Sequence, residues 1–307
     1  MQEHEARKGK GRRNGLFVAL VFVLIAAGPA LAVTGSAVWL EQGGGGRWLG
    51  MGGAARAASR DVYSGYWNPA GLTQMGSAQY QVGTMLELQT MDRATMSLSG
   101  AMQTDNMGNY GVTFIRHTIA GIEKVDELGN VLGEETSAGN AVLLSGGWSP
   151  LYQVRVGVTA KLLNESLLGF NAVGGGADIG MMVQPLLAEN LWLALTVHNV
   201  ASSMSWDGST SDTLARAIAG GVAWRVFSER YLLTADVVSR EGQGSAEFHG
   251  GAEVYIVPEA ALQAGVNDMR PCVGASFNWR IYELDYAFTY DREELGTHHQ
   301  VNFLLSF

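Results

Sequence analysis

The sequence predicts an all-β fold: a transmembrane, antiparallel, up-and-down β-barrel of about fourteen strands. Two observations predict it. Apolar residues recur at every second position in many segments of about ten residues, and the connections between these segments alternate between short and long. A period of two indicates a strand, because successive side chains leave opposite faces of the pleat. The segment lengths match the roughly 9–11 residues that a tilted strand needs to cross a bilayer.

The first 32 residues have the three parts of a secretory signal. Five basic residues between Arg7 and Arg13 precede a twelve-residue apolar run, LFVALVFVLIAA, and an A-x-A cleavage site follows and ends at Ala32. This apolar run is too short to span a bilayer as a helix, which needs about 20 residues. Residues 1–32 are therefore expected to be removed when the protein is exported.

Composition excludes several classes of protein. With 41 Gly, 8 Trp, 10 Tyr and only 16% charged residues, the chain is unlike a helical enzyme. Removing residues 1–32, which hold five Lys/Arg and two Asp/Glu, changes the formal net charge from −9 to −12, so nucleic acid is not an expected partner. The single cysteine, Cys272, has no partner for an internal disulfide and is expected to serve packing.

About fourteen segments show the period of two. In one of them, Val154 and Val156 share a face while Arg155 and Lys161 lie on the other. The predicted strands are residues 77–89, 93–103, 109–118, 139–148, 152–163, 173–184, 191–199, 213–226, 231–238, 246–256, 259–266, 271–278, 281–291 and 298–307.

The connections between the predicted strands are sorted by length. Those after even-numbered strands are short, such as SPL and VPE, whereas those after odd-numbered strands are mostly longer and polar. The exceptions are TMD and NDMR, and the longest connection is AGIEKVDELGNVLGEETSA. A soluble sandwich has no reason to sort its loops in this way. A barrel with both termini in the periplasm does, because it has short periplasmic turns and long outer loops.

The charged residues of the predicted strands keep to one face. An Arg or Lys facing lipid at the bilayer midplane costs about 2–4 kcal/mol, so this confinement predicts an apolar outer face and a polar lumen. The charged residues expected to face the lumen are Arg155, Lys161, Asp236, Glu247, Glu253, Glu283 and Asp285. The aromatic residues near the short turns, expected to form an interfacial belt, are Trp148, Tyr152, Trp192, Trp224, Tyr231 and Trp279.

The final strand keeps its alternation to the last residue. Phe303, Leu305 and Phe307 lie on one face, as required if the last strand pairs with the first to close a barrel. A final strand that ends on Phe resembles the signal by which outer-membrane barrels are recognised for insertion. This resemblance implies the barrel-assembly machinery as a partner.

Residues 33–76 precede the first strand and lack the period of two. They are rich in Gly and Ala and predict a short helix near Ala54–Ser59. The stretch GMGGAA is not a dinucleotide-binding turn, because no strand precedes it and no βαβ unit follows. Pro69 biases Asn68 away from helical backbone, and the Asn68 side chain can bond its own backbone, which predicts a rigid turn.

The stretch LGMGGAARAASRDVYSGYWNPAGL resembles the N-terminal hatch signature of the FadL-like outer-membrane proteins, and within them it is most similar to the PorV/PorQ branch. Later stretches agree, including LWLALTVHNVASSMSW and the final strand, so the resemblance covers residues 47–307. It implies that residues 33–76 form a hatch that plugs a barrel formed by residues 77–307. Carried over to this chain, the gating motif is Asn68, Pro69, Ala70 and Gly71, and the residues that shape the plug are Gly50, Gly52, Gly53 and Asp61. The alternative, that these residues only fold a plug, stays open.

Two functions follow from the resemblance. The first is passive transport of small hydrophobic molecules, gated by the hatch. The second is a scaffold for protein export and surface attachment by type IX secretion, in which partners contact the outer loops and the hairpin at Glu123–Glu135. This hairpin is read equally well as a solvated acidic tip.

Both functions place the mature protein in the outer membrane of a Gram-negative-type bacterium, in contact with lipid. An enzyme is not expected: His298 and His299 point to opposite faces and cannot share a metal, and no nucleophile turn is present. Neither a cofactor nor a metal is predicted.

Overall fold

The computed structural model describes residues 36–307 apart from residues 105–107, 187, 189, 208–209, 228–229 and 292–295. The expected signal and its cleavage site at Ala32 lie outside the described residues. Within the described residues, no helix is long and apolar enough to cross a membrane.

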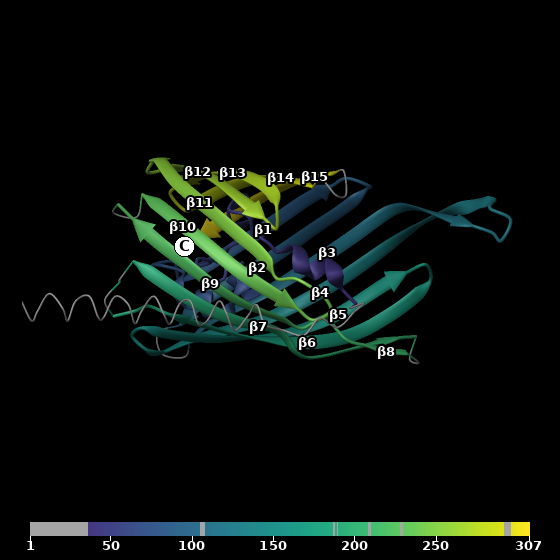
Figure 1. Cartoon of the computed structure of the whole chain (residues 1–307), viewed down its shortest axis with the longest axis horizontal. Helices are drawn as coiled ribbons and strands as arrows, with labels where there is room; N and C mark the ends of the chain where they lie inside the picture. Colours follow the sequence, from purple (N-terminus) through teal and green to yellow (C-terminus); the bar gives the residue numbers. More distant parts are fainter. Residues whose placement is uncertain are drawn as a thin grey trace, which may run out of the picture.

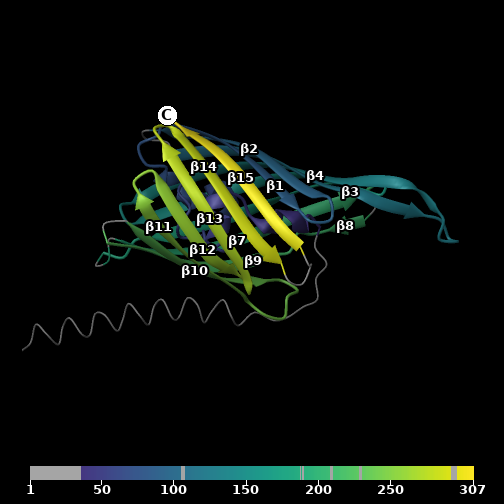
Figure 2. The same ribbon diagram turned by 90° about the horizontal axis from the view of Figure 1, so that it is seen from above.

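The structure is a closed antiparallel β-barrel of fourteen strands, which confirms the predicted fold (Figures 1 and 2). The ring closes because β6 pairs with β7 and β1 pairs with β15. The strands of the ring are β1 (Tyr80–Gln89), β2 (Arg93–Thr104), β3 (Gly108–Val125), β4 (Val131–Leu151), β5 (Val154–Leu167), β6 (Phe170–Val183), β7 (Leu191–Trp206), β9 (Ala217–Val226), β10 (Tyr231–Arg240), β11 (Glu247–Val257), β12 (Ala260–Asn267), β13 (Arg270–Trp279), β14 (Tyr282–Asp291) and β15 (Gly296–Ser306). A three-residue strand, β8 (Thr210–Asp212), pairs with β7 beside the ring.

The strands at the longest connection run further than predicted. The predicted strands ended at residue 118 and resumed at residue 139, with a hairpin expected at Glu123–Glu135, but β3 continues to Val125 and β4 begins at Val131. In the same way β5 and β6 extend toward each other until only Leu168 and Gly169 separate them. These polar stretches satisfy their backbone donors and acceptors by pairing with each other, so they form strands without an apolar face. One consequence is a β3–β4 hairpin that projects beyond the barrel at the end opposite to the C-terminus (Figure 1). We call this the hairpin end.

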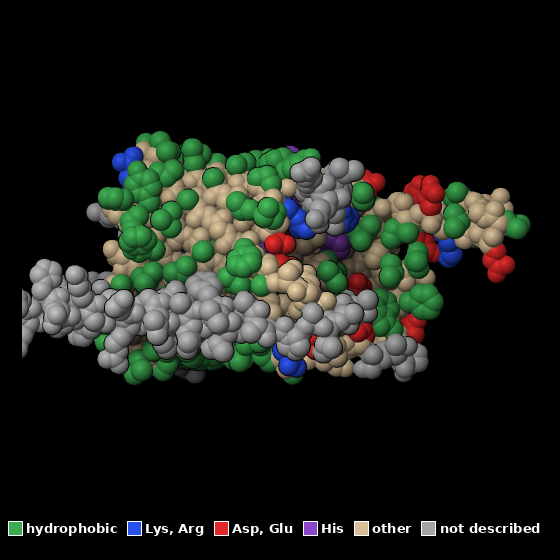
Figure 3. Space-filling model, in the orientation of Figure 1, with side chains coloured by type: hydrophobic (Ala, Val, Ile, Leu, Met, Phe, Trp, Pro, Cys, Tyr) green, Lys and Arg blue, Asp and Glu red, His purple; other side chains and the backbone are tan. Residues whose placement is uncertain are grey.

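Burial alternates along the strands as the sequence predicts. Phe303 on β15 is 40% exposed and the following terminal Phe307 is 57% exposed, whereas Gln300 and Asn302, at alternate positions of β15, are buried. Leu305, the third residue of the expected outward set, is half-buried. Apolar side chains are spread over the outer face of the strands (Figure 3). An apolar outer wall of this kind is stable in hydrocarbon, where a closed barrel leaves no backbone group without a partner.

One residue of the expected aromatic belt faces the other way. Trp192 is buried, and the guanidinium of Arg155 lies over its ring at 4.7 Å from the centroid. The alternation in LWLALTV places Trp192 on the face of Ala194 and Thr196, so its inward direction follows from the period of two rather than from residue type. Tyr152, Trp224 and Trp279 do lie exposed on the outside.

The segment before β1, residues 36–79, lies inside the barrel and is called the lumenal segment here (Figure 1). Its helical elements are short: η1 (Val38–Gln42), α2 (Gly46–Gly50), α3 (Ser64–Trp67) and η2 (Pro69–Gln74). The helix expected near Ala54–Ser59 is a single turn, with the N–H of Ser59 donating to the carbonyl of Ala55 at 2.8 Å. The N–H of Arg56, at the start of this turn, has no partner within the turn and donates to a carboxylate of the barrel wall.

The outward face makes a direct prediction about stability. Val301→Arg places a cation on the apolar outer face of β15 and is expected to destabilise the barrel by about 2–4 kcal/mol. Thr289→Arg on the neighbouring β14 points into a water-accessible cavity of the lumen and should cost less than about 1 kcal/mol. Reversible unfolding in lipid vesicles measures both. Equal destabilisation by the two substitutions would contradict the assignment of faces.

Candidate functional site

The lumenal segment runs from one end of the barrel to the other. At the hairpin end, the hydroxyl of Ser36 donates to Asp212 at 2.6 Å, and the indole N–H of Trp206 donates to the same hydroxyl. At the opposite end the segment leads into β1, where the N–H of Tyr80 donates to the carbonyl of Phe307 at 2.8 Å. The interior of the barrel is therefore the candidate site, and the segment occupies its whole length.

The glycine turn of the segment lies against the backbone of three strands. A Cβ added at Gly50 would come within 2.9 Å of the Cα of Gly274 on β13. Gly52 has φ +70° and its position leaves no room for a Cβ beside the carbonyls of Val266 and Gly250. Gly53, the third predicted glycine, has φ +73°. Gly50 and Gly52 therefore allow the segment to touch the wall backbone to backbone, whereas Gly53 lies next to the side chains of Trp67 and His249.

Asp61 is not part of this glycine turn. One carboxylate oxygen accepts a bond from the indole N–H of Trp48 at 2.7 Å, and the other accepts from the N–H of Tyr63 at 2.9 Å. Asp61 therefore ties α2 to the turn that precedes α3. These contacts of Asp61 lie within the segment and not against the wall.

The Asn68 turn forms a second contact with the wall. Asn68 is fully buried and caps η2: its Oδ1 accepts from the N–H of Ala70 at 3.1 Å. Its Nδ2 donates to the carbonyl of Arg56 at 2.8 Å and to that of Met181 at 3.4 Å. The amide thus holds the turn, a distant part of the segment and β6 together. The predicted rigid turn is present.

Glycines of the wall make room for this turn. Gly147, Gly157 and Gly180 lie side by side on β4, β5 and β6, in register. A Cβ at Gly147 or Gly157 would come within 2.8 Å of the carbonyl oxygen of Pro69, and a Cβ at Gly180 would overlap the amide of Asn68. Gly180 is the last residue of the stretch GGGADIG, and its lack of a side chain is what lets Asn68 approach β6 so closely. Gly71, the last residue of the predicted motif, faces the segment itself, next to Ser59 and Ser64.

Two arginines of the segment pair with carboxylates of the wall. Arg47 binds both oxygens of Glu253 on β11, at 2.7 Å from Nε and 2.6 Å from Nη2. Arg56 reaches Asp236 on β10 at 3.1 Å through its side chain and at 3.1 Å through its backbone N–H. All four residues are buried, so each charge depends on its partner.

The other predicted lumenal charges fall into separate groups. Glu247 contacts Arg240 at 3.2 Å, and Arg240 in turn contacts Glu41 of the segment at 3.1 Å. Glu283 lies 4.0 Å from Arg47, and its neighbour on the same strand face, Asp285, is buried.

Sequence reasoning did not identify the partners of Lys161. Lys161, which was predicted to face the lumen, contacts Asp178 on β6 at 2.8 Å and Asn199 on β7 at 2.8 Å. Asp178 also contacts His198 at 3.2 Å. Asp178 lies inside the GGGADIG stretch, at an inward position two residues before Gly180, and that parity was the signal available. His298 does face the lumen, 3.3 Å from Glu87, while His299 is exposed outside. The described residues contain no cluster of His, Cys, Asp and Glu that could hold a metal.

At the hairpin end, the lumen opens into a cavity of about 670 Å³, which we call the vestibule. Its wall is mixed in charge, with Glu87, Glu165 and Glu247 as well as Arg240 and His117 among its lining residues. The floor is the first part of the lumenal segment, where the ring of Trp39 is stacked on that of His117 at 5.7 Å.

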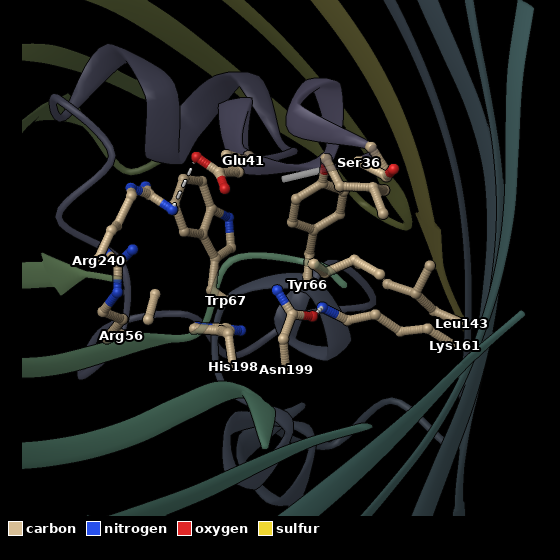
Figure 4. Close-up of a pocket in the computed structure, with 15 residues that line it drawn as sticks. Ser36, Glu41, Arg56, Tyr66, Trp67, Leu143, Lys161, His198, Asn199 and Arg240 are labelled. Carbon is tan, nitrogen blue, oxygen red and sulfur yellow. Dashed lines mark hydrogen bonds and ion pairs between the residues drawn. The ribbon is translucent and has the colours of Figure 1, made fainter. Parts of the chain in front are cut away.

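A much smaller chamber of about 50 Å³ lies beneath η1. The rings of Tyr66 and Trp67 stand in its centre, with Arg56 to one side and Lys161 to the other (Figure 4). Leu40, Leu143 and Leu214 supply apolar lining. The chamber and the vestibule share Ser36, Ala37, Glu41 and Trp67 in their walls, so parts of the segment form the partition between them.

Comparison with known proteins supports the fold but assigns no family. No protein-family model matches the chain, and no curated protein matches its sequence. Among solved structures it is similar to the CymD monoaromatic hydrocarbon channel, with 13% identity, a TM-score of 0.63, and coverage of 89% of this chain and 99% of that one. It is also similar to the Pseudomonas putida toluene transporter TodX (14% identity, TM-score 0.60, 86% and 97% covered) and to the Ralstonia pickettii toluene transporter TbuX (14%, 0.56, 87% and 99%). At these identities the likeness shows a shared barrel fold.

The glycine contact at Asn68 predicts a position-specific effect. Gly180→Ala puts a methyl group against the Asn68 amide, and overpacking of this kind costs about 1–3 kcal/mol. Gly100→Ala on β2 is the matched control, since a Cβ there meets nothing within 4 Å. Thermal unfolding should show a lower Tm for the first variant alone. An unchanged Tm for Gly180→Ala would contradict the close packing of the turn.

The buried ion pair at Asp236 predicts non-additive effects. Asp236→Leu leaves Arg56 charged and buried without its carboxylate, which costs about 3–5 kcal/mol. Arg56→Met combined with Asp236→Leu should recover most of this loss, because neither charge then remains. A double-mutant cycle on the free energy of unfolding measures the coupling. Additive losses would show that the two residues do not interact.

Proposed function

We propose that this protein is an outer-membrane barrel that lets small hydrophobic molecules pass without an energy source, and that the lumenal segment is its gate. In this proposal the hairpin end faces the outside of the cell and the C-terminal end faces the periplasm. The observation that carries the proposal is the partition of one closed lumen into an open vestibule and a small inner chamber by a segment that is not part of the wall.

The sizes of the two spaces support a gate. A cavity of about 150 Å³ holds benzene, whereas the inner chamber measures about 50 Å³. A molecule as small as a single aromatic ring therefore passes only when the segment moves. The vestibule, at about 670 Å³, is large enough to receive such a molecule first.

Part of the chamber lining offers carbon surface to an apolar cargo, beside the charged side chains of Arg56 and Lys161. Leu40, Leu143, Leu214, Tyr66 and Trp67 supply carbon surface there, and burying apolar area yields about 25 cal/mol per Å². The similarity to the CymD and TodX structures, named as hydrocarbon channel and toluene transporter, points to the same class of cargo. In this proposal the gate opens when η1 and the Asn68 turn move, and the turn must then give up its hydrogen bonds to Arg56 and Met181.

A reversible cross-link tests whether the segment moves. In Asn68→Cys/Gly180→Cys the two Cβ atoms are placed for a disulfide, since a Cβ built at Gly180 lies 3.0 Å from the Cγ of Asn68. Cells that carry the oxidised variant should take up toluene at least tenfold more slowly than cells that carry the reduced one, and dithiothreitol should restore uptake.

The controls separate gating from folding. Asn68→Cys alone should be insensitive to oxidation, and heat-dependent mobility on a denaturing gel should show that every variant forms a barrel. If the oxidised double variant takes up toluene as fast as the reduced one, the segment is not the gate. If neither the natural chain nor any variant raises uptake above that of cells lacking the protein, the proposal that the barrel transports toluene is wrong.

The projecting hairpin favours a second role, in which the barrel binds another protein outside the cell. This role corresponds to the export scaffold suggested by the PorV/PorQ resemblance. In it the segment would be a permanent filling, and secretion components or an exported protein should co-purify with the barrel whether or not the Asn68–Gly180 cross-link is formed.

A further inference from the structure

The tip of the β3–β4 hairpin is a two-stranded ribbon without neighbours. Pairing of β3 with β2 ends at Ile119, opposite Arg93, and pairing of β4 with β5 begins at Ala138, opposite Ser166. Beyond these points the two strands pair only with each other among the described residues, and the ribbon extends past the rest of the barrel in both views (Figures 1 and 2). A free strand edge of this kind is a template for another chain.

The two edges of the ribbon differ. On β3 the register shifts between Ile119 and Ile122, and the N–H of Ala120 is turned back to the carbonyl of Asp92 at 3.1 Å. On β4 the stretch Gly133–Ser137 contains neither the bulge near the tip nor a strand partner on its outer side among the described residues. The edge of β4 therefore offers available backbone groups between Gly133, which has φ +151°, and Ser137, whose hydroxyl donates to the carbonyl of Ser166 on β5 at 3.0 Å.

The negative charge of the ribbon indicates a positively charged partner. Residues 123–135 contain five Asp or Glu and one Lys, and acidic side chains gather on the projecting part of the surface (Figure 3). Lys124 contacts Glu135 at 2.7 Å on one face. On the other face Glu123 and Glu134 lie directly opposite each other, and among the described residues neither has an ion pair. Like charges directly opposite across a β-pair destabilise it, and cations from a partner would remove that repulsion.

Apolar side chains next to these acids add to the contact surface. Val131 and Leu132 on β4 are 59% and 64% exposed, and Leu128 at the tip is 87% exposed. At the hairpin end these residues lie beyond the strands that form the barrel wall, so lipid does not account for them. A strand that alternates basic and apolar residues would match both features, because its successive side chains leave opposite faces.

We propose that the edge of β4 at Gly133–Ser137 binds an extended, Lys- or Arg-rich segment of another protein as an added strand. Backbone hydrogen bonds supply the affinity, and Glu123 and Glu134 select for cations on one face. The proposal deepens the second role described above and does not depend on transport, so the Asn68–Gly180 cross-link neither supports nor weakens it.

The test uses the full-length protein in lipid nanodiscs and a short labelled peptide of alternating lysine and valine. The expected results are measurable binding by fluorescence anisotropy and slower amide hydrogen exchange at Gly133–Ser137 when the peptide is bound. Replacing both Glu123 and Glu134 by Gln should weaken binding roughly tenfold. Glu241→Gln, an exposed acid at the same end of the barrel, is the matched control and should bind as the natural chain does.

A second peptide separates strand addition from simple charge attraction. N-methylation at alternate residues on its pairing edge keeps every lysine but removes the backbone donors, so its binding should be lost. Equal binding of both peptides would overturn the added strand. Self-association of the protein without peptide, abolished by the double Gln variant, would show that the edge belongs to a second copy and would also overturn the proposal. Slower amide hydrogen exchange of the hairpin with lipopolysaccharide and Ca²⁺, but not with the peptide, would also overturn the proposal.

Discussion

The structure depends on one constraint: in a ring of fourteen strands, each strand has a neighbour on both sides. The pairings of β1 with β15 and of β6 with β7 close the ring, so within the wall the backbone groups are satisfied without water. Once the backbone is settled in this way, side chains can only point out or in. The period of two in the sequence follows from this division of side chains between two faces.

The inside of the ring poses a different problem, because the wall must hold a segment that has almost no regular structure of its own. Two kinds of contact do so. Rows of glycine let the backbone of the segment reach the backbone of the wall, at β11–β13 and at β4–β6. Buried pairs such as Arg47 with Glu253 then fix which part of the segment lies where, since a shift of one residue would leave both charges unpaired in a dry interior.

Much of the wall could be predicted from the sequence and much of the interior could not. Alternation places Phe303 outside and Asp285 inside because a strand has only two faces. The same alternation puts Trp192 on the face of Ala194 and Thr196, which is the inward face, so the assignment of Trp192 to the belt overlooked a signal that was present. The hairpin could be expected from the sequence, but not how far its strands continue, because they lack an apolar face. The partners of Lys161 could not be predicted either, since Asp178 and Asn199 reach it from strands whose neighbours are set by tertiary structure.

The interior filling also bears on how the molecule is assembled. The segment precedes β1, and its contacts reach β4–β6 on one side and β10–β15 on the other. The seam between β1 and β15 joins the first and last strands of the ring. When this seam forms, it encloses a segment that is already covalently joined to β1. The segment can thus act as an internal template, around which the two halves of the sheet curve to the same radius before the cylinder is complete.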